Sequence, residues 1–136
     1  MSTNVSVRWL RISYWVGAVA DAFAAIVMLS QAILGHQSPL TTYVPEVPYR
    51  YAMGWGGSLM LGWSFLLLWA DRRPLERRGV LPITNVVIVG LLATDIAAMQ
   101  AGFVSPTSMA PLLVLQVLLI LLFSTSYVRA GRCQGA

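Results

Sequence analysis

The chain has 136 residues, of which 57% are hydrophobic and 10% are charged, and its formal net charge is +4. A soluble domain usually carries about 25% charged residues, and a small one has too much surface to cover with so few. All nine basic residues are arginine, and they form no basic face or aromatic–basic motif of the kind that binds nucleic acid. The composition therefore indicates an integral membrane protein and excludes nucleic acid as the partner.

The apolar residues fall into four long runs, which is the pattern of membrane-spanning helices. About 20 residues cross the hydrocarbon core of a bilayer, and each run has about this length. The sequence predicts helices over residues 11–34, 50–70, 81–101 and 111–128. Because the connections are short, we expect an all-α, up-down-up-down bundle that forms a single domain over residues 1–136.

The first seven residues are polar, and we expect them to lack regular structure. A cleavable signal peptide is the alternative for the first run, because Ala18-Val19-Ala20 resembles a cleavage site. The apolar segment before this site is short, however, and the run continues well beyond it. Gly35 is placed to end the first helix in a left-handed conformation.

The arginines predict the orientation of the bundle in the membrane. Arg50 alone lies on one side, and the other eight lie on the opposite side: Arg8, Arg11, Arg72, Arg73, Arg77, Arg78, Arg129 and Arg132. Short loops with an excess of arginine stay in the cytoplasm. We therefore predict a multi-pass protein of the cell membrane with both termini cytoplasmic. The loop arginines Arg72, Arg73, Arg77 and Arg78 are predicted to contact anionic lipid headgroups.

The first run carries an aspartate, Asp21, roughly 15 Å from its cytoplasmic end. A carboxylate at bilayer depth is costly, so it is a functional-site hypothesis by default. Trp63 and Ser64 of the second helix are expected at a similar depth, and both can donate a hydrogen bond to a carboxylate. The alternative is a structural role, in which a protonated Asp21 fastens the first helix to the second.

A second aspartate, Asp95, is expected roughly 9 Å below the outer surface on the third helix. Gln116 of the fourth helix should lie at about the same depth, so we predict a hydrogen bond between them. Arg50 is the only cation near either aspartate, and we expect it above Asp95 rather than Asp21. Structural pairing is again the alternative to a functional role.

Small residues recur every four positions on the second helix, at Gly54, Ser58 and Gly62. Such a ladder lets another helix approach closely, which matters because lipid provides no hydrophobic drive for helix association. We favour packing within the chain over a contact between chains.

No catalytic signature is present, and neither a phosphate-binding glycine loop nor a serine–histidine–acid arrangement occurs. The only histidine, His36, is far in sequence from the only cysteine, Cys133, so we predict no metal site and no cofactor.

The chain is short, is predicted to have four helices, and has an acid midway along the first helix, in Gly17-Ala18-Val19-Ala20-Asp21. In this layout it resembles the small multidrug resistance transporters. That family has glutamate at this place and a shorter chain, so no binding residues are carried over.

Three functions stay open. The favoured one is an oligomeric transporter or channel subunit, in which Asp21 binds a proton or cation and Asp95 is an outer station. The second is a non-catalytic membrane module that stabilises a larger partner through the Gly54, Ser58 and Gly62 face. The third is a small membrane enzyme acting on a lipid or isoprenoid; the sequence favours a protein that is not an enzyme.

Overall fold

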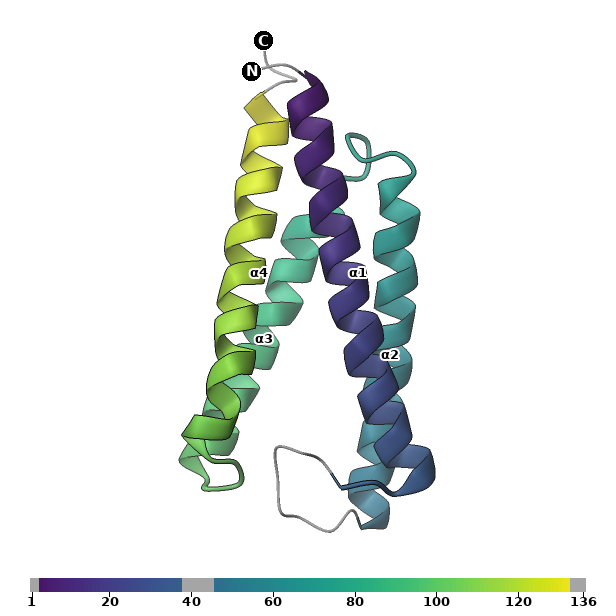
Figure 1. Ribbon diagram of the computed structural model, residues 1–136, viewed down its shortest axis with the longest axis vertical. Helices are drawn as coiled ribbons and strands as arrows, with labels where there is room; N and C mark the ends of the chain where they lie inside the picture. Colours follow the sequence, from purple (N-terminus) through teal and green to yellow (C-terminus); the bar gives the residue numbers. More distant parts are fainter. Residues whose placement is uncertain (1–2, 38–45, 133–136) are drawn as a thin grey trace.

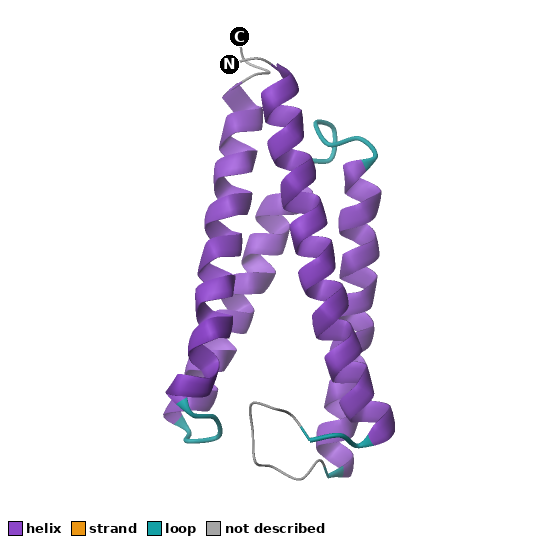
Figure 2. Ribbon diagram, viewed as in Figure 1, coloured by secondary structure: helices purple, strands orange, loops and turns teal. Residues whose placement is uncertain are grey.

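Four helices make up the part of the chain that the computed structural model describes, residues 3–37 and 46–132. They are α1 (Thr3–Leu34), α2 (Val47–Asp71), α3 (Val80–Gln100) and α4 (Pro106–Arg132). No strand occurs in these residues, and the helices alternate in direction along the chain (Figures 1 and 2). The predicted all-α, up-down-up-down architecture is therefore confirmed.

Three of the described helices, α1, α3 and α4, are long and apolar enough to cross a membrane. This finding supports a small integral membrane protein that crosses the bilayer more than once. The second helix is 25 residues long but is not among the three. It contains four glycines and two serines, which have a lower hydropathy than large aliphatic residues. The second helix packs along α1, which is itself a candidate span. That α2 also crosses the membrane stays a prediction.

Two helices extend far beyond their predicted bounds, whereas α2 begins three residues early and ends one residue late, and α3 is shifted by one residue. The expectation that residues 1–7 lack regular structure is wrong for residues 3–7, because α1 begins at Thr3 and packs against α4, with Ser6 fully buried. The fourth helix begins at Pro106 rather than residue 111, because the Ser105 hydroxyl accepts a hydrogen bond from the Ser108 amide at 3.2 Å, as an N-terminal cap does. It also continues to Arg132 instead of ending at residue 128.

Glycines in the left-handed conformation end two helices. Gly35 has a φ of 68° and follows the last residue of α1, as predicted. Gly102, with a φ of 71°, ends α3 in the same way, and the next amide, of Phe103, donates to the Ala98 carbonyl at 3.0 Å. Both positions need glycine because this conformation is strained for other residues.

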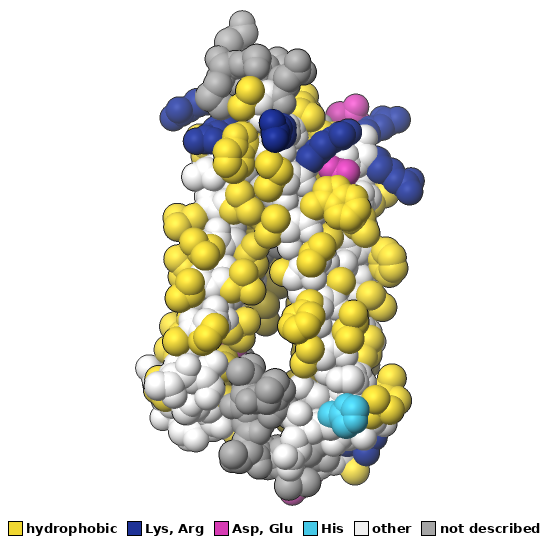
Figure 3. Space-filling model, in the orientation of Figure 1, with side chains coloured by type: hydrophobic (Ala, Val, Ile, Leu, Met, Phe, Trp, Pro, Cys, Tyr) yellow, Lys and Arg dark blue, Asp and Glu magenta, His cyan; other side chains and the backbone are white. Residues whose placement is uncertain are grey.

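The helices form two pairs, α1 with α2 and α3 with α4, which meet at one end and diverge toward the other (Figure 1). We call the joined end the basic end; it holds the start of α1, the loop of residues 72–79 and the end of α4. Arginine side chains gather there, while hydrophobic side chains cover much of the lateral surface (Figure 3). The buried core joins the pairs, and its members are Leu10, Tyr14, Ala18, Leu67, Ala70, Leu81, Ile88, Leu119, Phe123 and Ala130.

The closest contact between α1 and α2 is made at glycines other than those of the predicted ladder. A Cβ atom on Gly57 would lie 2.8 Å from Cγ of Leu29, so only glycine fits there. Gly62 has no atom within 4 Å of such a Cβ, and Gly54 meets only the Cβ of Ala32, at 3.7 Å. The predicted packing of this ladder within the chain is therefore wrong for Gly62, and also for Ser58, which is exposed.

Gly57→Ala is expected to lower the free energy of unfolding by about 1–3 kcal/mol, because the added methyl group overpacks the contact with α1. Gly62→Ala is the matched control, since open space at that position leaves only the higher helix propensity of alanine, about 0.5–1 kcal/mol in its favour. Denaturant unfolding in detergent micelles, followed by circular dichroism, measures both. Equal stability of the two variants would contradict this helix contact.

Candidate functional site

A layer of packed side chains closes the bundle at the level of Gly17. A Cβ atom on Gly17 would lie 2.8 Å from Cζ of Phe123 and 2.9 Å from Cδ1 of Leu67, so three helices meet there without room to spare. Both of these side chains are fully buried. We call this contact of Gly17, Leu67 and Phe123 the seal.

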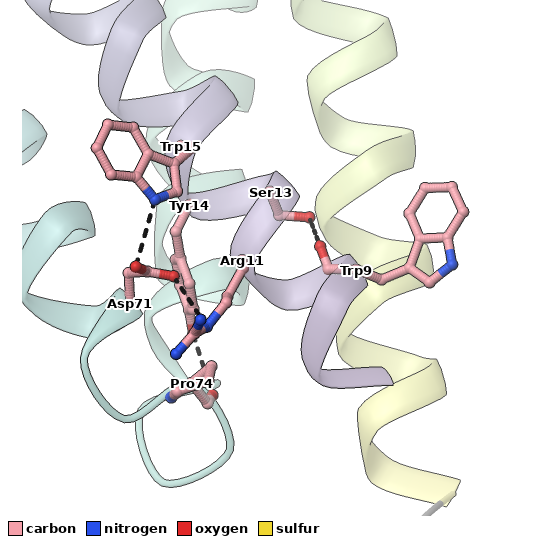
Figure 4. A network of polar contacts seen from close by, with 7 residues as sticks. All are labelled: Trp9, Arg11, Ser13, Tyr14, Trp15, Asp71 and Pro74. Carbon is pink, nitrogen blue, oxygen red and sulfur yellow. Dashed lines mark hydrogen bonds and ion pairs between the residues drawn. The ribbon is translucent and has the colours of Figure 1, made fainter. Parts of the chain in front are cut away.

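Polar contacts fasten the basic end beyond the seal (Figure 4). The hydroxyl of Tyr14 lies 3.1 Å from the carbonyl oxygen of Arg77 and 3.3 Å from that of Pro74. Asp71 accepts a hydrogen bond from Nε1 of Trp15 at 3.3 Å, and its other carboxylate oxygen lies 3.8 Å from Nε of Arg11. These contacts tie the loop that leads into α3 to the first helix.

Serine hydroxyls join α1 to α4 at the same end. Ser13 and Ser126 are both buried, and the hydroxyl of Ser13 lies 2.8 Å from that of Ser126. The Ser13 hydroxyl also donates to the carbonyl oxygen of Trp9 at 3.0 Å. The two helix pairs are thus held together by polar as well as apolar contacts.

Asp95 and Gln116 lie together, as predicted. Nε2 of Gln116 donates to Oδ2 of Asp95 at 2.7 Å, which joins α3 to α4. Gln116 is 6% exposed, and the second atom of its amide, Oε1, is buried without a hydrogen-bond partner among the described residues.

Asp21 is half-buried, and its Oδ2 atom is buried without a hydrogen-bond partner among the described residues. The two predicted donors point elsewhere. Nε1 of Trp63 donates to Oγ1 of Thr84 on α3 at 3.1 Å. The hydroxyl of Ser64 donates to the Ala18 carbonyl at 2.8 Å, one turn of α1 away from Asp21. The expected fastening of Asp21 to α2 is therefore absent from the described part of the chain.

Arg50 does not lie above Asp95, contrary to the prediction. Its Nε donates to the carbonyl oxygen of Ala32 and its NH2 to that of Ile33, both at 2.9 Å. These carbonyls belong to the last turn of α1, where no intrahelical donor is available and the helix dipole favours a cation. The terminus of the neighbouring helix is thus the partner of Arg50.

Helix periodicity places Asp21 and Gln116 on the same helix faces as two residues of the seal. Asp21 follows Gly17 by four residues and shares its face of α1, and Gln116 precedes Phe123 by seven residues and shares its face of α4. Along the helix axes, Asp21 lies about 6 Å and Gln116 about 10 Å from the seal, on the side away from the basic end. Figure 3 shows an opening between the pairs on this side of the molecule. A buried carboxyl group at this level can bind a proton or a cation.

Arginines at the basic end lie over aromatic rings at the level where lipid headgroups would be. The guanidinium carbon of Arg77 is 3.4 Å from the centroid of the Trp69 ring, and that of Arg129 is 5.1 Å from the Trp9 ring. The guanidinium carbon of Arg78 is 5.8 Å from the centroid of the Tyr127 ring. Such cation–π pairs hold both partners at the membrane interface.

The sequence did not indicate that Tyr14, Asp71 and Phe123 would be structurally important. Tyr14 and Phe123 stood within long apolar runs, and Asp71 belonged to a charged loop. Their spacing gave no signal, because each acts through a contact with a distant helix or loop. Among the described residues, no three of histidine, cysteine, aspartate and glutamate are grouped so that they could hold a metal ion.

No protein-family model matches the chain, and no curated protein and no solved structure match it either. The resemblance in layout to the small multidrug resistance transporters therefore rests on the sequence alone.

Proposed function

We propose that the protein is a small transporter or channel subunit that moves a proton or a monovalent cation, and that Asp21 is the group that binds it. The observation that carries this proposal is the buried Oδ2 atom of Asp21 without a partner in the described residues. Withdrawing a carboxylate from water without a partner costs several kcal/mol. The group is therefore expected to take up a proton or a cation.

The divergence of the helix pairs supports access from one side only. The opening lies away from the basic end, and the seal lies between Asp21 and the basic end. Asp95 and Gln116 are hydrogen-bonded to each other, and Gln116 lies farther from the seal along the helix axis than Asp21, which is consistent with an outer station. Because four helices enclose little volume, we propose that the protein works as a homo-oligomer.

The proposed orientation places the basic end in the cytoplasm of the cell, next to anionic lipid. Arg72 and Arg73 support this, since both are exposed at that end and would reach phosphate groups. In a Cys133→Ser background, we expect Glu76→Cys to be protected from a membrane-impermeant thiol reagent added to intact cells. His36→Cys at the other end is expected to react. The reverse labelling pattern would contradict this orientation.

Purified protein in liposomes tests the proposed transport directly. A pH-sensitive dye trapped inside reports the decay of a pH gradient, and we expect the decay to be faster with the protein than in protein-free liposomes. The rate should increase with the number of protein molecules per vesicle. Equal rates with and without the protein would contradict the proposal.

A second candidate function is a non-catalytic module that binds a larger membrane protein. It is favoured by the small-residue face of α2, where Gly62 has no neighbour within 4 Å of a built Cβ. Such a face allows a helix of another chain to approach closely. Crosslinking in native membranes is expected to recover a heteromeric complex that Gly62→Leu abolishes. Recovery of monomers alone would argue against this function.

A further inference from the structure

A surface groove lies at the basic end, where the first turns of α1 pass the end of α2. Its volume is about 560 Å³. It is lined by Val7, Arg8, Arg11, Ile12, Trp15 and Asp71. We call it the arginine–aspartate groove. Its α1 residues all precede Gly17, so the groove and Asp21 lie on opposite sides of the seal along the helix axis.

Positive and negative charges lie side by side in this groove. Nε of Arg11 is 3.8 Å from Oδ1 of Asp71, too far for a hydrogen bond, and Oδ1 has no hydrogen-bond partner among the described residues. The other carboxylate oxygen accepts a hydrogen bond from Nε1 of Trp15 at 3.3 Å (Figure 4). Arg8 precedes Arg11 by three residues and therefore shares its face of α1. The groove thus offers two guanidinium groups and a carboxylate oxygen that lacks a donor.

Apolar side chains continue the groove along α1, away from the basic end. They recur at three- and four-residue spacing and so form one stripe, Ile12, Trp15, Val19, Phe23 and Ile26. All five side chains are exposed. Because α1 is a candidate membrane span, this stripe would face the hydrocarbon of the bilayer. A ligand of the groove can therefore place acyl chains beside the same helix, which a water-soluble phosphate compound lacks.

We propose that the arginine–aspartate groove binds a phospholipid whose headgroup carries a primary ammonium group, as in phosphatidylethanolamine. The phosphate accepts hydrogen bonds from Arg8 and Arg11, and the ammonium group donates to the carboxylate of Asp71. The side chain of Arg11 is 58% exposed and makes no hydrogen bond to Asp71, so it can turn to the phosphate and leave Oδ1 to the ammonium group. This site lies beyond the proposed function, because Asp21 is not part of it.

The carboxylate of Asp71 selects this class of lipid. Phosphatidylglycerol has a phosphate for the arginines but no cation for Asp71. Phosphatidylcholine has a cation, but methyl groups replace every hydrogen on its nitrogen, so it has no donor for Oδ1. Phosphatidylethanolamine supplies an anion for the arginines and an N–H donor with positive charge for Asp71 in one molecule.

Native mass spectrometry of the detergent-solubilised protein, titrated with dioleoyl lipids, tests the inference. We expect phosphatidylethanolamine to bind at least about 10-fold more tightly than phosphatidylcholine with the same acyl chains. Replacing the hydrogens of the ethanolamine nitrogen by methyl groups, one after another, should lower the affinity stepwise. This series uses the wild type alone, so it tests the site even if a substitution prevents folding. Glycerophosphoethanolamine, which has the headgroup without acyl chains, should not displace the lipid.

Two substitutions separate the parts of the headgroup. Asp71→Asn is expected to lower the affinity for phosphatidylethanolamine by about 10-fold and to leave that for phosphatidylcholine within about twofold. Arg8→Gln should weaken both lipids, because both carry the phosphate. Arg132→Gln removes an exposed arginine of the basic end outside the groove. It is the matched control and should bind both lipids as the wild type does.

Equal affinity of the wild type for phosphatidylethanolamine and phosphatidylcholine, or tighter binding of phosphatidylglycerol, would overturn the site. An unchanged preference in folded Asp71→Asn would do the same. Displacement by glycerophosphoethanolamine would overturn the assignment to a membrane lipid. Asp21-dependent proton flux seen alongside any of these results would leave the proposed function intact.

Discussion

Asp21→Asn is expected to bring proton flux through the reconstituted protein down to the rate of protein-free liposomes. Asparagine has nearly the shape of aspartate, but it neither gains nor loses a proton at neutral pH. The stability of the protein should change by no more than about 1 kcal/mol, since Oδ2 of Asp21 makes no hydrogen bond in the described structure that the substitution would remove. The pairing of lost flux with retained stability separates a functional aspartate from a structural one.

Asp71→Asn is the matched control for this prediction. Asp71 contacts Trp15 and Arg11 at the basic end, on the other side of the seal from the opening. We expect its loss to lower stability by about 1 kcal/mol and to leave flux within twofold of the wild type. Flux that persists in Asp21→Asn, or a large loss of stability in that variant, would contradict the assigned role of Asp21.

Phe123→Ala is expected to destabilise the protein by about 3–5 kcal/mol and to make the surviving folded fraction leak ions. The ring of Phe123 is fully buried and fills the space in front of Gly17. Removing it leaves a cavity where the two helix pairs meet, between the opening and the basic end. Ion leakage through this cavity should not depend on Asp21, so Asp21→Asn added to Phe123→Ala is expected to leak as much.

Phe65→Ala provides the control with the same substitution. Phe65 is 64% exposed on α2, where it would face lipid. We expect this variant to keep the stability of the wild type to within about 1 kcal/mol. Liposomes that contain it should not leak ions. Dye-loaded liposomes measure the leak, and denaturant unfolding measures the stability. If liposomes containing folded Phe123→Ala did not leak ions, the proposed role of the seal as an ion barrier would be contradicted.

The sequence correctly predicted the features that depend only on the distance of a residue along its helix, such as the depth of a side chain or the position of a helix end. Because each residue advances an α-helix by about 1.5 Å, counting from the ends placed Asp95 and Gln116 at one depth, and they do form a hydrogen bond. The left-handed glycine at Gly35 followed from position alone in the same way.

The sequence did not predict what depends on rotation about a helix axis or on a partner far along the chain. Trp63 and Ser64 were expected at the depth of Asp21, but they face Thr84 of α3 and a backbone carbonyl of α1. The predicted packing was wrong at Ser58 and Gly62 for the same reason, since the face of α2 that contacts α1 includes Gly57. A rotation of about 100° per residue makes neighbouring positions face different helices.

Infrared difference spectroscopy of the reconstituted protein tests the central claim most directly, namely that the carboxyl group of Asp21, whose Oδ2 atom has no hydrogen-bond partner among the described residues, binds and releases a proton. A step to higher pH should convert a protonated-carboxyl band of the wild type into a carboxylate band. Asp21→Asn should lack this pair of bands. A wild-type spectrum without these bands, or the same bands in Asp21→Asn, would contradict the account.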